Sequence, residues 1–89
     1  MNTIVIGQVV YSKNGRDGGG CFVVVKVDGE YVYLVDGALR TLQKPKKKKQ
    51  KHVQMTHTVL YEIAKKIVAA DRSLLDANIR KALMPYRRA

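Results

Sequence analysis

Short runs of β-branched and aromatic residues, separated by glycine-containing turns, dominate the first half of this chain. The clearest runs cover residues 4–11, 21–27 and 31–35, and their composition is typical of β-strands. The dipeptide Asp28-Gly29 lies between the second and third runs and predicts a two-residue hairpin turn with positive φ at both positions. Residues 40–43 and 52–55 are predicted to form two shorter strands, so we expect five strands in total.

Short strands joined by tight turns fit a small barrel better than a sandwich, because closing the sheet leaves few exposed edges. After Thr56 the apolar residues recur at spacings of three and four, which predicts a helix to residue 68 that begins near Thr56 or Thr58. A second helix is predicted over residues 73–83 and is stopped by Pro85. We therefore expect a mainly β protein with a five-stranded barrel at 1–56 and a two-helix tail at 57–89.

A block of lysines at residues 44–51 carries much of the charge. The chain has 17 Lys and Arg against 7 Asp and Glu, a formal net charge of +10. Because charges this close repel one another, we expect an exposed, mobile loop whose lysines bind phosphates with little sequence specificity. A solubilising loop or a nuclear-targeting signal is the alternative. The candidate RNA contacts here are Lys44, Lys46, Lys47, Lys48, Lys49, Lys51 and the adjacent His52.

A glycine-rich loop at residues 13–20 precedes the second predicted strand. It lacks the Lys-Ser/Thr ending of a P-loop and leads into a strand rather than a helix, which argues against nucleotide hydrolysis. Glycines allow backbone N–H groups to converge on an anion, so the loop predicts RNA contact, a plain hairpin connection being the alternative. The candidate contacts in and beyond this loop are Lys13, Asn14, Gly15, Arg16 and Arg40.

Aromatic residues offer a second kind of contact. Tyr31 and Tyr33 share one face of the third predicted strand, because side chains alternate along a strand. Packing in or on the barrel is the expected role of these tyrosines. Stacking of one of them on an unpaired base is the alternative.

The sequence gives no support for catalysis or for a cofactor. The two histidines, His52 and His57, have no cysteine or carboxylate near them in sequence to complete a metal site. Cys21 lies in an apolar run and is expected to be a small core residue. A single cysteine cannot form a disulfide framework, and the lack of one in so small a chain suits the reducing cytoplasm. No apolar stretch approaches a bilayer span, and the first residues do not resemble a signal peptide. We therefore expect no enzyme activity, no catalytic or metal site, no cofactor and no membrane partner.

Residues 6–25 resemble a KOW motif, which combines a strand opening at Gly7, a basic glycine-containing loop and a valine-rich second strand. The continuation to residue 53 is similar to the archaeal and eukaryotic large-subunit ribosomal protein group called fourteen-e, and to short bacterial relatives of that group. The resemblance implies an SH3-like barrel that binds RNA, often ribosomal RNA. Carried over by position, residues 13–16 correspond to the loop that faces RNA, and residues 46–51 to the basic segment before the last strand.

These observations together predict a non-enzymatic RNA-binding protein, expected to be a cytoplasmic monomer. Ribosomal RNA is the expected partner, with ribosomal proteins as further partners. The triple glycine and the lysine block depart from the ribosomal relatives, so a permanent ribosome component and a visiting factor are both open. The alternatives are a KOW module that binds DNA or a transcription complex, and a protein-interaction adaptor.

Overall fold

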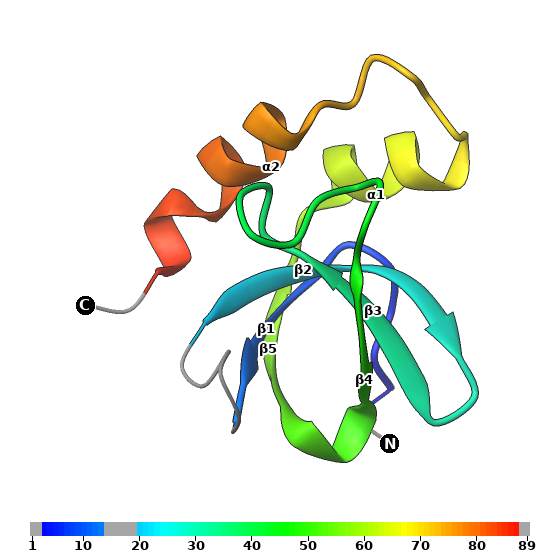
Figure 1. The fold of residues 1–89 in the computed structure, drawn as a ribbon, viewed down its shortest axis with the longest axis vertical. Helices are drawn as coiled ribbons and strands as arrows, with labels where there is room; N and C mark the ends of the chain where they lie inside the picture. Colours follow the sequence, from blue (N-terminus) through cyan, green and yellow to red (C-terminus); the bar gives the residue numbers. More distant parts are fainter. Residues whose placement is uncertain (1–2, 14–19, 88–89) are drawn as a thin grey trace.

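Five antiparallel strands form one sheet, and two short helices lie against one of its faces (Figure 1). The computed structural model describes residues 3–13 and 20–87. The strands are β1 (Gln8–Ser12), β2 (Cys21–Asp28), β3 (Tyr31–Val35), β4 (Lys46–Lys49) and β5 (Val53–Val59). The helices are α1 (Tyr61–Val68) and α2 (Asp76–Leu83), with single 3-10 turns η1 (Gln50–His52) and η2 (Met84–Tyr86). The expectation of a mainly β protein with five strands and two short helices is confirmed.

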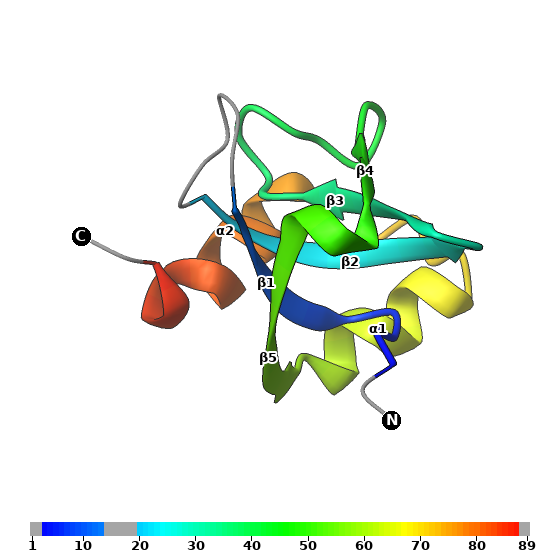
Figure 2. The same ribbon diagram turned by 90° about the horizontal axis from the view of Figure 1, so that it is seen from below.

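The strand order is β4-β3-β2-β1-β5, so four consecutive strands form a meander and β5 returns to pair with β1 (Figure 2). The prediction of a closed barrel is wrong, because β4 and β5 are the two edges of the sheet and no ladder joins them within the described residues. They are connected only by η1, whose first backbone N–H bonds to the carbonyl oxygen of Glu30 (2.8 Å). This bond continues the contact with the β2–β3 hairpin directly after the last β4 pair. The chain then turns through η1, and β5 pairs along β1.

The hairpin between β2 and β3 forms one residue later than predicted. Asp28 pairs with Tyr31, so the central turn residues are Gly29 and Glu30. Gly29 has a φ of 59°, whereas Glu30 is not among the residues with positive φ. Positive φ at the first central position alone is the pattern of a type II′ turn. In this turn Asp28 is the last residue of β2 rather than a central turn residue.

The predicted strand at residues 40–43 is absent, and these residues belong to a loop between β3 and β4. The carboxylate of Asp36 accepts hydrogen bonds from the backbone N–H groups of Ala38 and Arg40, both at 2.9 Å. An aspartate that binds the backbone a few residues further on produces a turn, which removes this segment from the sheet.

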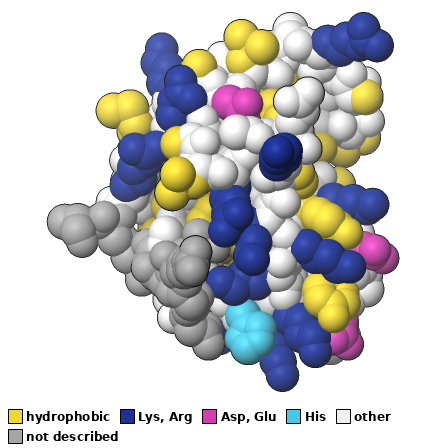
Figure 3. Space-filling model, in the orientation of Figure 1, with side chains coloured by type: hydrophobic (Ala, Val, Ile, Leu, Met, Phe, Trp, Pro, Cys, Tyr) yellow, Lys and Arg dark blue, Asp and Glu magenta, His cyan; other side chains and the backbone are white. Residues whose placement is uncertain are grey.

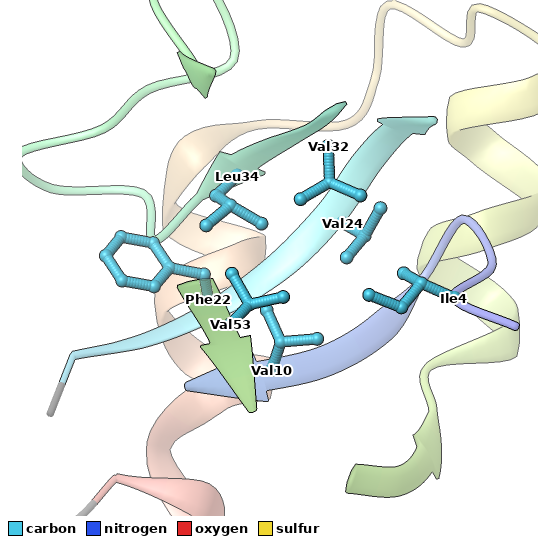
Figure 4. Close-up of a cluster of buried hydrophobic side chains, with 7 residues drawn as sticks. All are labelled: Ile4, Val10, Phe22, Val24, Val32, Leu34 and Val53. Carbon is cyan, nitrogen blue, oxygen red and sulfur yellow. The ribbon is translucent and has the colours of Figure 1, made fainter. Parts of the chain in front are cut away.

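Apolar side chains fill both faces of the sheet. The inner cluster lies within the bend of the sheet, and Figure 4 shows its seven side chains pointing toward one another. It consists of Ile4, Val10, Phe22, Val24, Val32, Leu34 and Val53. The outer cluster joins the opposite face of the sheet to the tail, and consists of Val9, Cys21, Val23, Val35, Leu74, Ile79 and Leu83. Cys21 is therefore buried, as expected.

Both helices begin later than predicted. The hydroxyl of Thr56 donates to the carbonyl oxygen of Val9 (2.7 Å), which keeps this segment in β5, and α1 begins only after Leu60. The second helix begins after Leu75, whose backbone N–H donates to the side-chain oxygen of Asn78 (2.8 Å). Each helix has eight residues. No helix in the described part of the chain is long and apolar enough to cross a membrane.

Candidate nucleic-acid interface

The middle of the lysine block, Lys46–Lys49, is a strand rather than part of a mobile loop, which corrects the sequence-based expectation. Residues Lys46–Lys49 form β4 and pair antiparallel with β3, with Lys49 opposite Tyr31 and Lys46 opposite Leu34. Because side chains alternate along a strand, Lys47 and Lys49 lie on the face of Tyr31 and Tyr33. The other two lysines lie on the face of the inner cluster. The four lysines therefore have two different environments.

The outward lysines lie against tyrosine rings. The Lys47 Nζ is 4.5 Å and the Lys49 Nζ 6.0 Å from the centre of the Tyr31 ring. On the other side of β3, the Lys26 Nζ lies 5.2 Å from the centre of the Tyr33 ring. These distances fit cation–π contacts, which relieve some of the repulsion within the block. We call these five residues the lysine–tyrosine surface.

The lysine–tyrosine surface lies on the half of the outer face that the helices leave uncovered (Figure 1). Val35 lies on the same face of β3 as Tyr33, two residues away, and is buried in the outer cluster beneath the helices. Tyr31 and Tyr33 are only half-buried. A register shift in β2 between Val24 and Lys26 keeps the lysine on the outer face, opposite Tyr33. One sheet face thus changes along β3 from apolar and covered to cationic and open.

Lys48 has a structural role that the sequence analysis did not foresee. Its Nζ donates a hydrogen bond to the hydroxyl of Ser12 (2.5 Å), and Ser12 is 3% exposed. Lys48 belongs to the edge strand β4, whereas Ser12 ends β1 and pairs with Val53 of β5. The side chain therefore reaches across the inner face from the edge strand β4 to the end of β1. Lys46 shares this inner face and is half-buried.

A second cationic group adjoins the lysine–tyrosine surface. The Lys13 backbone N–H donates to the carbonyl oxygen of His52 (2.9 Å), which places the start of the glycine-rich loop beside η1. Lys13 and Lys51 are exposed, and His52 is half-buried. A hollow of about 230 Å³, lined by Glu30, Lys49, Gln50 and Lys51, connects this end to the lysine–tyrosine surface. The predicted contacts Asn14, Gly15 and Arg16 lie outside the described residues.

The predicted contacts Arg40 and Lys44 lie elsewhere. The Arg40 carbonyl oxygen accepts hydrogen bonds from the backbone N–H groups of Asp36 and Gly37, just after β3 ends. Tyr31, at the opposite end of β3, is the residue that pairs with Lys49. Lys44 is exposed in the same loop as Arg40. The structure therefore does not bring these two residues to the end of the sheet that carries Lys13 and His52.

The surface view shows the same distribution. In Figure 3, Lys and Arg side chains gather over β4 down to the lower edge of the molecule, where a histidine lies beside them. At the lower right, in the region of β4 and the β2–β3 hairpin, blue and yellow side chains alternate. Few acidic side chains are visible on this face (Figure 3). Within the lysine–tyrosine surface, Lys49 forms an ion pair with Glu30 at 3.4 Å. An exposed ion pair of this kind is weak and leaves the surface cationic.

Groups that perform acid–base or metal chemistry do not gather in the described residues. No group of three or more His, Cys, Asp or Glu side chains there is placed to hold a metal ion. The pKa of Asp71 is lowered, chiefly because its carboxylate accepts a hydrogen bond from the backbone N–H of Ser73 (2.8 Å). This turn lies in the connection between the helices and is far in sequence from the interface.

The sequence analysis missed Lys26 and gave Tyr31 and Tyr33 a packing role. The alternation of residues along β3 already placed both tyrosines on one face. The partners of these rings depend on two cross-strand registers, and one of these contains a bulge that period-two reasoning does not anticipate.

No protein-family model matches this chain, and a search of curated proteins found no match either.

Proposed function

We propose that this protein is a non-enzymatic RNA-binding protein that holds structured RNA through its phosphates. The observation that carries the proposal is the lysine–tyrosine surface, on the half of the outer face that the helices leave uncovered. Together with Lys13, Lys51 and His52 it forms a cationic end to the molecule. Ammonium groups on flexible stems suit phosphates, which position a nucleic acid without reading its sequence.

We also propose that the sheet is an incompletely closed SH3-like barrel of the KOW type. The support is the order of strands, in which a four-stranded meander is followed by a strand that returns to β1. The single 3-10 turn η1 joins the last two strands directly, and the Lys48 hydrogen bond to Ser12 links β4 to the end of β1, beside β5.

The resemblance to ribosomal relatives makes ribosomal RNA the first RNA to test. The same resemblance underlies the proposal that the protein contacts ribosomal proteins. The proposal that it works in the cytoplasm rests on its single cysteine and the lack of a disulfide framework. A KOW motif is equally compatible with DNA or a transcription complex, so the experiment includes a DNA ligand.

The test measures binding of a fluorescent RNA hairpin by anisotropy over a series of KCl concentrations. The site variant carries Lys26→Gln, Lys47→Gln and Lys49→Gln. Its matched control removes three exposed charges from the helical tail through Lys65→Gln, Arg72→Gln and Lys81→Gln. Each variant loses three positive charges, so the formal net charge falls from +10 to +7 in both.

We expect the site variant to bind the RNA hairpin more weakly and the control to bind nearly as the natural chain does. The slope of log K against log salt changes by about 0.7 to 0.9 for each phosphate that is no longer neutralised, so by about 2 to 3 for three phosphates. Equal weakening in both variants would show that net charge, not this surface, drives binding. A DNA hairpin that binds as tightly as the RNA hairpin would favour the DNA-binding alternative. If the natural chain binds neither hairpin, the proposal of nucleic-acid binding fails and a protein-interaction adaptor is the alternative to test.

A further inference from the structure

The two tyrosines of β3 form a feature that phosphate binding alone does not use. Tyr31 and Tyr33 are two residues apart on one face of a strand, which separates them by about 7 Å along the strand. Both tyrosines are half-buried, and a lysine ammonium group lies over each ring. Aromatic rings on an uncovered sheet face are a recurring platform for unpaired bases.

We propose that Tyr31 and Tyr33 stack on two unpaired bases of a single-stranded RNA segment, while Lys26, Lys47 and Lys49 move from the rings to its phosphates. This inference rests on the proposed function and names the part of the RNA that the surface recognises, a loop, bulge or end. A base in a duplex is already stacked and paired, so its face is not available to a tyrosine ring.

The strength of the competing contacts supports this exchange. An exposed cation–π contact changes an equilibrium constant by about twofold to fivefold, whereas stacking of one base changes it by about fivefold to 150-fold. A base can therefore displace a lysine from a ring. The displaced ammonium groups of Lys47 and Lys26 remain beside the base that has entered, where the phosphate backbone must also pass.

The position of the three lysines fits a strand of RNA that follows β3. Lys26 lies across from Tyr33 on β2, and Lys47 and Lys49 lie on β4 on the other side of β3. The tyrosine pair is therefore flanked by positive charge along both neighbouring strands. Stacking is tolerant of sequence because every base has an aromatic face, so we expect binding without strong base preference.

The experiment compares a labelled RNA that has no self-complementarity with the same RNA annealed to its complement. The site variant carries Tyr31→Leu and Tyr33→Leu, since leucine keeps an apolar contact with the sheet and removes the ring. A second variant, Tyr31→Phe with Tyr33→Phe, keeps both rings and serves as the rescue. The matched control is Tyr61→Leu, at a tyrosine that is 72% exposed on α1.

We expect the leucine variant to bind the single strand at least about tenfold more weakly, with a much smaller change for the duplex. The phenylalanine variant and Tyr61→Leu should retain the natural single-strand affinity. Because the chain has five Tyr and no Trp, unlabelled RNA should also quench tyrosine emission. This quenching should be smaller in the leucine variant. The far-UV circular dichroism of each variant checks that it is folded.

Two other outcomes would overturn the inference and are distinguishable. If the leucine variant weakens single-strand and duplex binding equally, or not at all, the tyrosines do not stack on bases although the proposed function stands. If the natural chain binds neither RNA, the proposed function fails together with this inference. A leucine variant that does not fold is replaced by the single Tyr31→Leu variant, judged by the same ratio of single-strand to duplex affinity.

Discussion

At the scale of single residues, Lys48 differs from its neighbours in β4 because its ammonium group is hydrogen-bonded across the inner face to a residue of β1. The side chain lies on the inner face and donates a hydrogen bond to Ser12, which is 3% exposed. Hydrogen bonds that involve a charged group stabilise a fold more than neutral ones do. Lys48 is therefore better understood as part of the fold than as a phosphate contact.

We predict that Lys48→Ala lowers the free energy of unfolding by about 1.5 to 3 kcal/mol, the usual range for a hydrogen bond to a charged group. Lys44→Ala is the control, and because Lys44 is exposed in a loop it should change stability by about 0.5 kcal/mol or less. Urea unfolding followed by circular dichroism measures both. Equal effects of the two substitutions would show that the Ser12 contact contributes nothing.

The alternation of residues explains how far the sequence could reveal the candidate interface. It placed Tyr31 and Tyr33 on one face, and the charge of the block marked its lysines as candidates. It could not reveal that Lys48 is turned inward, because that depends on which residue of β3 faces it. Lys26 was hidden for the same reason, since the bulge before it shifts the register of β2.

At the scale of elements, the loop between β3 and β4 and the helix α2 fix each other in place. The backbone N–H of Leu42 donates to the carboxylate of Asp76 (2.8 Å), and the guanidinium of Arg80 donates to the carbonyl oxygen of Gly37 (2.5 Å). Gly37 itself has a φ of 82°. A side chain at that position would meet the Asp76 carbonyl oxygen and lie 3.0 Å from the Arg80 backbone nitrogen.

We predict that Gly37→Ala destabilises the protein by about 3 kcal/mol, because left-handed strain adds to a clash with the backbone of α2. Gly29→Ala is the matched control, since Gly29 also has positive φ (59°) but an added side chain meets nothing within 4 Å. It should cost about 1 to 2 kcal/mol, the left-handed strain alone. Thermal unfolding of both variants tests the difference, and equal losses would mean that α2 moves freely away from the loop.

The elements that the sequence predicted well are those whose signals are local. The β2–β3 hairpin and the two helices follow from β-branched runs, a turn glycine and helical spacing. The strand β4 could not be predicted from its composition, because lysine is a poor strand former and neighbouring charges repel. It forms because pairing with β3 satisfies its backbone and places two of its lysines over a tyrosine ring.

At the scale of the whole molecule, the net charge of +10 affects both the stability of the fold and its affinity for RNA. Added salt should change these two quantities in opposite directions. Like charges held together in the folded state repel one another, which destabilises it relative to the expanded unfolded chain. Salt screens this repulsion, and it also weakens phosphate binding because the release of counterions becomes less favourable. Stability and RNA affinity should therefore change in opposite directions when salt is added.

We predict that the melting temperature of the free protein rises between ~0.02 M and ~0.3 M NaCl, a range over which the screening length falls severalfold. The Lys26→Gln, Lys47→Gln and Lys49→Gln variant should show a smaller rise, because it carries less of the repulsion on β2 and β4. Circular dichroism melts at each salt concentration measure this. A melting temperature that falls with salt would mean that ion pairs such as Glu30–Lys49 outweigh the repulsion. The cationic end would then contribute to the stability of the fold rather than oppose it. RNA binding would not be needed to explain why its lysines are held so close together.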